Sequence, residues 1–245
     1  MQANEYLRAG KLKEAIQALN ERVRQNPLDT KLRTFLFELL CFAGEFDRCG
    51  KQLEFLAEGG RNAELGVLLY RAALSAERSR QQFFVDKEYE DRHEPAKSLA
   101  GTLNGKPFHQ ISDADSRIGA RLEVFLGAAY VWVPFEHITS VTIQEPKRLR
   151  DLIWTPALIH TAESFQGRDL GEVLIPVLSP GSWQHSDDAV RLGRVTVWES
   201  QEDGTEVPFG QKLLSVDGDE VPILELRNLE LGGGYRGPMT NYASF

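Results

Sequence analysis

Two aspartates separated by one residue, Asp113 and Asp115, have the most metal-like spacing in the sequence. Ca²⁺ and Mg²⁺ prefer clustered carboxylate oxygens, but a calcium loop needs a further ligand where Arg117 stands and a glycine directly after it, and Gly119 comes one residue late. The other interpretation is a turn in which an aspartate accepts backbone N–H bonds and Arg117 pairs with a carboxylate. We predict the turn, with no metal and no cofactor. A metal-dependent enzyme that uses Asp113 and Asp115 is the alternative.

A second polar group, Ser182, His185 and Asp187, has the residue types of a hydrolase triad. The Gly-x-Ser-x-Gly sequence that presents such a nucleophile is missing, and triad members normally come from separate parts of a chain. These residues therefore indicate a polar loop. The histidines do not follow metal-ligand spacing, and two cysteines are too few for structural zinc. We predict no catalytic residue and no enzymatic activity.

Short apolar runs rich in β-branched and aromatic residues must position the aspartate pair. Residues 122–126 and 130–134 flank a glycine-containing turn, which predicts a β-hairpin, and residues 138–143 predict a third strand. Because no helices alternate regularly with the later apolar runs, we predict a mostly antiparallel, β-rich region. Those later runs are residues 172–176, 194–198 and 221–231. Residues 99–109 are expected to form the junction before this region.

The first 60 residues contain an internal repeat with a period of 34 residues. Small, small and large residues recur in one order: Gly10, Ala15 and Leu19, then Gly44, Cys49 and Leu53. This period is typical of tetratricopeptide (TPR) helical hairpins, in which small residues let paired helices approach closely. A long helix over residues 62–84 and a charged linker over residues 86–94 are expected to follow.

These patterns predict an α+β protein with TPR-like α-helical repeats at residues 1–95 and a β-rich domain at residues 96–245. The glycine-rich stretch from Gly232 is expected to be a loosely packed end. The net charge is -8 at pH 7, which argues against nucleic acid or an anionic membrane as a partner. The acidity belongs to the β-rich part, which holds 20 acidic and 13 basic side chains after Pro95.

Cys41 and Cys49 lie in apolar helical context without the spacing of a disulfide framework, which indicates reduced core residues. The sequence starts without a basic and then apolar signal. Its apolar runs are shorter than the about 18 residues of a membrane-spanning helix. We therefore expect a cytoplasmic protein.

Helical repeats present a concave face that can hold a helix or an extended peptide of a partner. Helical spacing places Lys31, Thr34 and Glu38 on that face in the second repeat. We predict that these three residues contact a partner.

Further charged and aromatic residues lie beside the apolar runs of the β-rich part. Trp154 precedes a Thr–Pro break and is expected to be partly exposed, whereas Trp132 and Trp198 lie within apolar runs and are expected in the core. The charged residues form either structural pairs or, with Trp154, a surface for a partner. They are Asp113, Asp115, Arg117 and Arg150.

Several of these segments, in this order, resemble the ImpE/TagJ family of bacterial type VI secretion accessory proteins. The segments are residues 33–41, 113–119, 130–135, 149–157, 175–182 and 192–198. The resemblance covers most of the chain. It implies a non-enzymatic adaptor of the contractile sheath that connects the small sheath subunit with ClpV, the AAA+ ATPase that disassembles contracted sheaths.

A general TPR co-chaperone module is a further alternative. Such modules clamp acidic peptide tails with several Lys and Arg side chains on the concave face, where this sequence offers only Lys31 clearly. We therefore rank it below the adaptor and below the metal-dependent enzyme.

Overall fold

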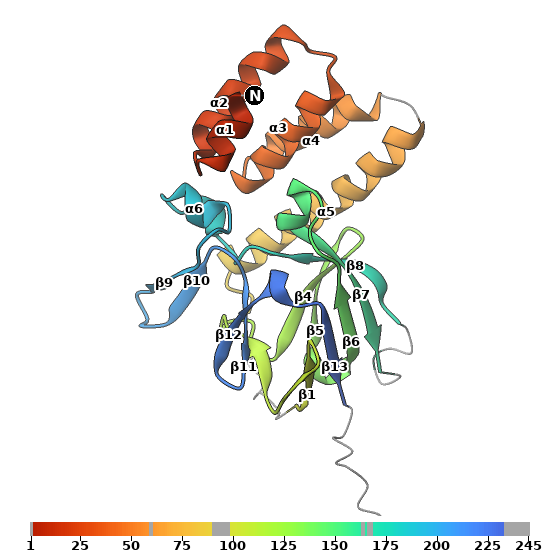
Figure 1. Cartoon of the computed structure of the whole chain (residues 1–245), viewed down its shortest axis with the longest axis vertical. Coiled ribbons are helices and arrows are strands. Elements are labelled where there is room, and N and C mark those ends of the chain that lie inside the picture. The colour runs from red at the N-terminus through yellow and green to blue at the C-terminus, as the bar shows by residue number, and fades with distance from the viewer. Residues whose placement is uncertain (1, 59–60, 90–98, 163–164, 166–168, 233–245) are drawn as a thin grey trace, which may run out of the picture.

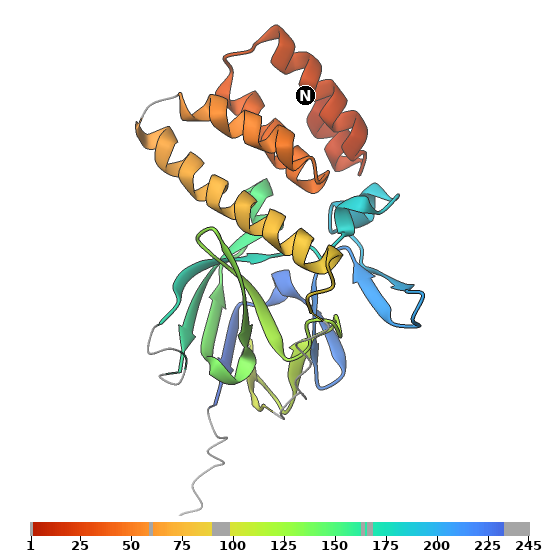
Figure 2. The same ribbon diagram turned by 180° about the vertical axis from the view of Figure 1, so that it is seen from behind.

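The computed structural model describes residues 2–58, 61–89, 99–162, 165 and 169–232. Helices from the first part of the chain lie over one end of a β-structure built from the rest (Figures 1 and 2). The chain is therefore an α+β protein, as predicted. The predicted boundary between residues 95 and 96, the end of the charged linker and the residues after Gly232 lie outside the described part.

Two helical hairpins and one long helix form the first part: α1 (Gln2–Arg8), α2 (Leu12–Gln25), α3 (Thr30–Phe42), α4 (Phe46–Ala57) and α5 (Arg61–Val85). Gly10 and Gly44 stand at the turns of the two hairpins with φ of 75° and 68°, in the left-handed region that favours glycine. The bounds of α5 agree with the predicted helix to within one residue at each end.

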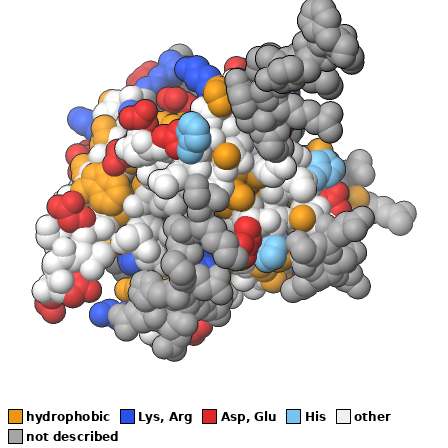
Figure 3. Space-filling view, turned by 90° about the horizontal axis from the view of Figure 1, so that it is seen from below, with side chains coloured by type: hydrophobic (Ala, Val, Ile, Leu, Met, Phe, Trp, Pro, Cys, Tyr) orange, Lys and Arg blue, Asp and Glu red, His pale blue; other side chains and the backbone are white. Residues whose placement is uncertain are grey.

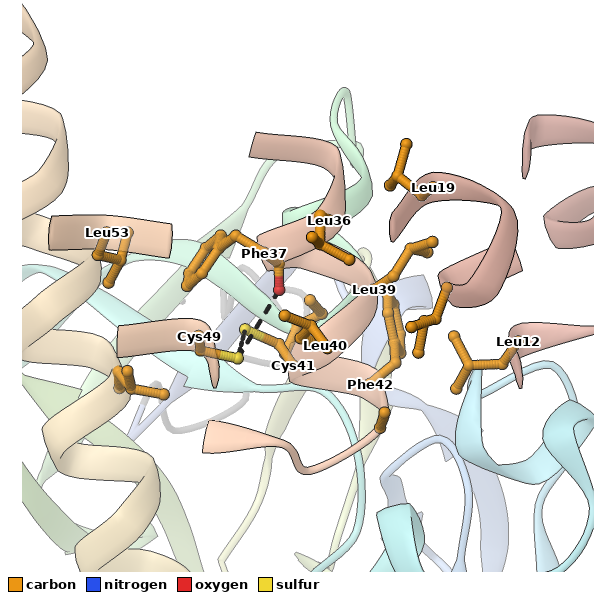
Figure 4. Packing of buried hydrophobic residues seen from close by; sticks show 14 of the residues in the cluster. Leu12, Leu19, Leu36, Phe37, Leu39, Leu40, Cys41, Phe42, Cys49 and Leu53 are labelled. Atoms are coloured by element: carbon orange, nitrogen blue, oxygen red, sulfur yellow. Dashed lines mark hydrogen bonds between the residues drawn. The ribbon is translucent and has the colours of Figure 1, made fainter. Parts of the chain in front are cut away.

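The other four repeated residues, Ala15, Leu19, Cys49 and Leu53, lie in one core, and Figure 4 shows Leu19, Cys49 and Leu53 within it. Ala15 and Cys49 are fully buried between paired helices, as their size predicts. The thiol sulfur atoms of Cys41 and Cys49 are 3.5 Å apart, and both cysteines are free. The positions that set the 34-residue period are thus all buried or at turns.

The main sheet has eight strands in the order β2-β1-β13-β6-β7-β8-β4-β5, and all its neighbouring strands are antiparallel. The predicted hairpin is β4 and β5, and the predicted third strand is β6. The strand bounds are β1 (Gly101–Leu103), β2 (Lys106–Phe108), β4 (Arg121–Leu126), β5 (Ala129–Pro134), β6 (Ile138–Ile143), β7 (Trp154–Thr161), β8 (Gly171–Pro176) and β13 (Asn228–Leu231).

Two smaller antiparallel sheets complete the β-rich part. They are β12-β11-β3, with β3 (Ile111–Asp113), β11 (Leu213–Val216) and β12 (Asp219–Pro222), and β10-β9, with β9 (Val197–Ser200) and β10 (Glu206–Phe209). A short helix, α6 (Asp188–Arg191), lies beside α1 and α2 (Figure 1). From the end away from the helices, acidic, basic and hydrophobic side chains are interspersed on the described surface (Figure 3).

Two local predictions were wrong. Residues 99–109 are not a junction loop, because β1 and β2 form a hairpin there and β1 pairs with β13 inside the main sheet. Trp198 is 36% exposed rather than in the core, because its strand, β9, pairs only with β10 in the two-stranded sheet and is not part of the main sheet.

The helical and β-rich parts share one hydrophobic core. Phe125 of β4, Ile153, Trp154 of β7 and Leu192 belong to the same buried cluster as the helices. Helix α5 lies between the hairpins and the strands and contacts both β4 and β5 (Figures 1 and 2). Within the described residues, the structure contains no helix with the length and hydropathy to span a membrane.

Candidate functional site

The aspartate pair forms the predicted turn. Asp113 Oδ1 accepts the backbone N–H of Asp115 at 2.9 Å, and Asp115 Oδ1 accepts the backbone N–H of Arg117 at 3.1 Å. The guanidinium of Arg117 also donates to the Asp115 carboxylate, with Nη2 and Oδ2 2.6 Å apart. Both aspartates are buried. The turn interpretation is therefore confirmed, and Asp113 and Asp115 do not reach the surface as a partner contact would require.

A buried ionic network joins this turn to helix α5. Lys212 Nζ lies 2.6 Å from Asp113 Oδ2 and 2.5 Å from Glu123 Oε2. On its other side, Glu123 accepts Arg80 Nε at 2.7 Å and Arg80 Nη2 at 3.0 Å. Arg80 is further paired with Glu77 at 3.1 Å. The network thus links α5, β4, the end of β3 and the segment before β11.

Mutual pairing decides which groups in the network carry charge. Burial alone would raise the pKa of Glu123, but Arg80 and Lys212 outweigh burial and hold that pKa well below its usual range. Burial raises the pKa of Asp113 to about 7, against the lowering by Lys212. Burial would lower the pKa of Lys212, yet Asp113 and Glu123 raise it. Lys212 and Glu123 are therefore a charged pair.

The carboxylates of the network are occupied, and little space lies beside them. Its carboxylates are held by cationic side chains of the chain itself, and the neighbouring cavity has a volume of about 20 Å³, room for about one water molecule. Among the described residues there is no group of three or more His, Cys, Asp or Glu side chains with metal-binding geometry. The arrangement connects elements of the fold.

Sequence reasoning missed Arg80, Glu123 and Lys212, all at most 1% exposed. One signal was available, because Glu123 interrupts the apolar run of residues 122–126. A charged residue inside a buried strand needs a partner of opposite charge. The partners lie 43 and 89 residues away along the chain, so the sequence does not identify them.

The predicted partner face of α3, formed by Lys31, Thr34 and Glu38, reaches the β-rich part at its Glu38 end. Lys31 is exposed and Thr34 is partly exposed, whereas Glu38 is buried at 9% exposure. Burial raises the pKa of Glu38 to about 7, with a further rise from Asp151 and a lowering from Arg148, both at the 3₁₀ turn η3 (Leu149–Leu152). The far end of the predicted face therefore meets η3.

Two further predicted site residues lie at this meeting point. The Arg150 guanidinium is partly buried, 4.7 Å from the centre of the Tyr70 ring. Trp154 is 2% exposed, and its indole N–H donates to Glu77 Oε2 at 2.8 Å. The expected exposure of Trp154 was wrong, because the helices cover the start of β7.

The polar loop with the triad residue types is structural. The Ser182 hydroxyl donates to the Ser179 carbonyl at 2.6 Å and accepts the Gly210 N–H at 2.8 Å. Asp187 accepts the backbone N–H of Ala189 and caps α6. His185 Nδ1 accepts the backbone N–H of Asp187. These contacts confirm the prediction of a polar loop.

Residues 182–194, which we call the clamp segment, attach the β-rich part to the turns of both helical hairpins. Asp188 Oδ2 accepts the N–H groups of Leu12 at 2.7 Å and Lys13 at 3.3 Å and so caps α2. Arg194 donates to the carbonyls of Leu7 and Arg8 at the first turn.

At the second hairpin turn, the clamp segment contacts Gly44. A Cβ on Gly44 would come within 2.3 Å of the Trp183 ring. Glycine is therefore required there for two reasons: a side chain would clash with the ring, and the φ lies in the left-handed region. The glycines of both hairpin turns therefore lie at the contact between the helical and β-rich parts.

Comparison with known proteins places these features in a family. The sequence model described as ImpE protein matches residues 105–230. The type VI secretion system accessory component TagJ of Pseudomonas aeruginosa is 32% identical over 94% of this chain and 91% of its own. The crystal structure of protein VPA1032 from Vibrio parahaemolyticus has the same fold, with a TM-score of 0.83 at 24% identity, covering 94% of this chain and 97% of that one. This chain belongs to the ImpE family.

Proposed function

We propose that this protein is an accessory component of a bacterial type VI secretion system, where it acts in the cytoplasm as a non-enzymatic adaptor. Its two partners would be the small sheath subunit and a ClpV-type AAA+ ATPase. The observation that carries the proposal is the 32% identity, over almost the whole chain, to a protein named as such an accessory component. The two free, buried thiols suit a reducing compartment.

The buried ionic network supports a binding role over catalysis. Arg80, Glu123 and Lys212 are used within the fold, and Asp113 and Asp115 are each engaged by a cation of the chain. The alternative of a metal-dependent enzyme would require Lys212 and Arg117 to leave these carboxylates. We therefore expect added Mg²⁺, Mn²⁺ or Ca²⁺ to leave the melting temperature unchanged, since a ligand that binds only the folded state would raise it.

We propose that the first helices are a TPR-like unit whose partner surface consists of the α3 face and η3. Lys31, Thr34 and Arg150 would contact the partner, together with Arg117 of the β-rich part, whose side chain is 15% exposed. The buried members of the predicted set would hold this surface in place. They are Glu38, Asp113, Asp115 and Trp154.

The test is a pull-down with the purified full chain against the small sheath subunit and the ATPase of the same gene cluster. We expect binding to the small sheath subunit. Lys31→Glu or Arg150→Glu should weaken it about tenfold, because each substitution reverses a positive charge that the proposed surface presents to the partner. Lys106→Glu on β2 makes the same charge change on an exposed residue outside the proposed surface and should bind normally.

Two outcomes would contradict the proposal. Failure of the folded chain to bind either protein would remove the adaptor role. Equal binding by the wild type, Lys31→Glu and Arg150→Glu would keep the adaptor role but move its surface elsewhere. Melting curves of all variants separate lost binding from lost folding.

A further inference from the structure

Helix α5 carries a stripe of exposed leucines in its first half. Leu65, Leu68 and Leu69 are 67%, 64% and 49% exposed. Together with Ala72 they follow the i, i+3, i+4, i+7 spacing that aligns side chains along one side of a helix. Leu74, by contrast, is buried against the rest of the chain. We call the four aligned residues the leucine stripe; helical residues with this spacing normally pack against another helix.

A shallow, mostly apolar groove of about 340 Å³ runs along one flank of the leucine stripe. It is lined by Ala57 at the end of α4 and by α5 residues that include Glu64 and Arg71. These two charged residues are exposed and seven positions apart, about two helical turns, so they lie on the same flank. Among the described residues neither has an ion-pair partner.

The order of these charges makes the flank self-complementary. When two copies of one helix pack antiparallel about a twofold axis, each flank faces the same flank of the other copy, and residue i contacts residue j while j contacts i. An axis close to Leu68 brings Glu64 of each copy beside Arg71 of the other. Leu68 then meets its own counterpart, and Leu65 of each copy meets Leu69 of the other. A parallel arrangement would place the charged flank against the opposite flank and would lose both ion pairs.

We infer that the leucine stripe is the interface of a homodimer in which the first halves of two α5 helices pack antiparallel. The leucine stripes of the two copies pack against each other in its centre. Two Glu64–Arg71 ion pairs form along one edge. The occupant is a second copy because one surface supplies both the apolar contact and its own opposite charges.

The experiment is sedimentation of the purified full chain over concentrations from about 1 to 300 μM, since a small interface gives a dissociation constant in the micromolar range. We expect a dimer that forms with rising concentration. Leu68→Glu should raise the dissociation constant at least about a hundredfold, because each copy would bury a carboxylate in the apolar centre. Leu28→Glu, which changes a leucine that is 78% exposed in the turn before α3, is the matched control and should dimerise normally.

The charges provide a second, independent readout. Glu64→Lys and Arg71→Glu should each raise the dissociation constant about tenfold, since each creates two like-charge contacts. The double variant Glu64→Lys with Arg71→Glu exchanges the two charges and should restore the wild-type value. Restoration is expected only for antiparallel self-pairing.

Three outcomes would overturn the inference. If the wild type stays monomeric at every concentration, the leucine stripe is not a homodimer interface. A helix of a different protein would then be its candidate partner. A dimer that persists in Leu68→Glu would have its interface elsewhere. A double variant that stays as weak as the single variants would exclude the antiparallel arrangement.

Discussion

At the residue scale, the chain places several ionisable groups out of contact with water and relies on pairing to keep them stable. Glu123 is completely buried between Arg80 and Lys212, with both carboxylate oxygens bonded. Removing one member of such a set leaves an uncompensated buried charge, which typically costs 3–5 kcal/mol, about a third or more of the stability of a typical domain. The network is therefore a strong constraint on how α5 meets the strands.

Glu38 gives a testable pH dependence. Its pKa rises from 4.5 to about 7 on folding, so between these values the folded chain binds the proton that the unfolded chain has released. The stability contributed by protonated Glu38 is complete below about pH 4.5 and is lost as pH rises to about 7. Glu38→Gln cannot ionise, so its stability should exceed that of the wild type by up to about 3 kcal/mol at pH 8, with no such difference at pH 4.5.

Urea unfolding from pH 4.5 to 8 measures this difference. Glu220→Gln, which changes an exposed glutamate on β12, is the control and should follow the wild type at every pH. Parallel curves for Glu38→Gln and the wild type would show that the pKa of Glu38 is not raised on folding.

At the element scale, helix α2 depends on a distant residue for its first turn. Lys11 at its N-cap provides no side-chain hydrogen bond, and the carboxylate of Asp188 in the clamp segment accepts the free N–H groups instead. A carboxylate at a helix N-terminus also interacts favourably with the helix dipole. The same aspartate pairs with Arg191 within α6, so it links two elements.

Asp188→Ala should therefore lower the free energy of unfolding by about 1 kcal/mol and speed amide hydrogen exchange in the first turn of α2. Asp29→Ala is a matched control, because Asp29 caps α3 from the adjacent residue and its loss should speed exchange in α3. Unchanged exchange at Leu12 and Lys13 in Asp188→Ala would contradict the capping role. Asp188→Asn keeps an acceptor and should lose less.

At the scale of the whole molecule, the helical and β-rich parts are bound by the shared core, the ionic network and the clamp segment. We propose residues 1–95 and 96–245 as the two domains, and we expect neither to fold alone. Separation would expose Phe125 and Trp154 of the β-rich part. It would also leave Arg80 of the helical part without Glu123.

This prediction can be checked by expressing each part separately and recording thermal unfolding. The control is the full chain with a protease site between residues 95 and 96, whose two pieces should stay associated after cleavage. Cooperative unfolding of either part alone, at the midpoint of the full chain, would show that the domains are independent.

The sequence by itself determined the elements whose signals are local. Apolar periodicity identified α5, the β4–β5 hairpin and β6, because burial of one face imposes a fixed spacing. The Asp113–Arg117 turn was also predictable, because its bonds join residues two positions apart.

The tertiary structure alone decided which distant charges meet. Asp113 pairs with Lys212, Glu123 with Arg80, and Asp188 caps a helix 176 residues earlier. With 28 basic and 36 acidic side chains, the sequence allows many pairings. The fold selects a few, because only those charges that the packed elements enclose together lose their water and need each other.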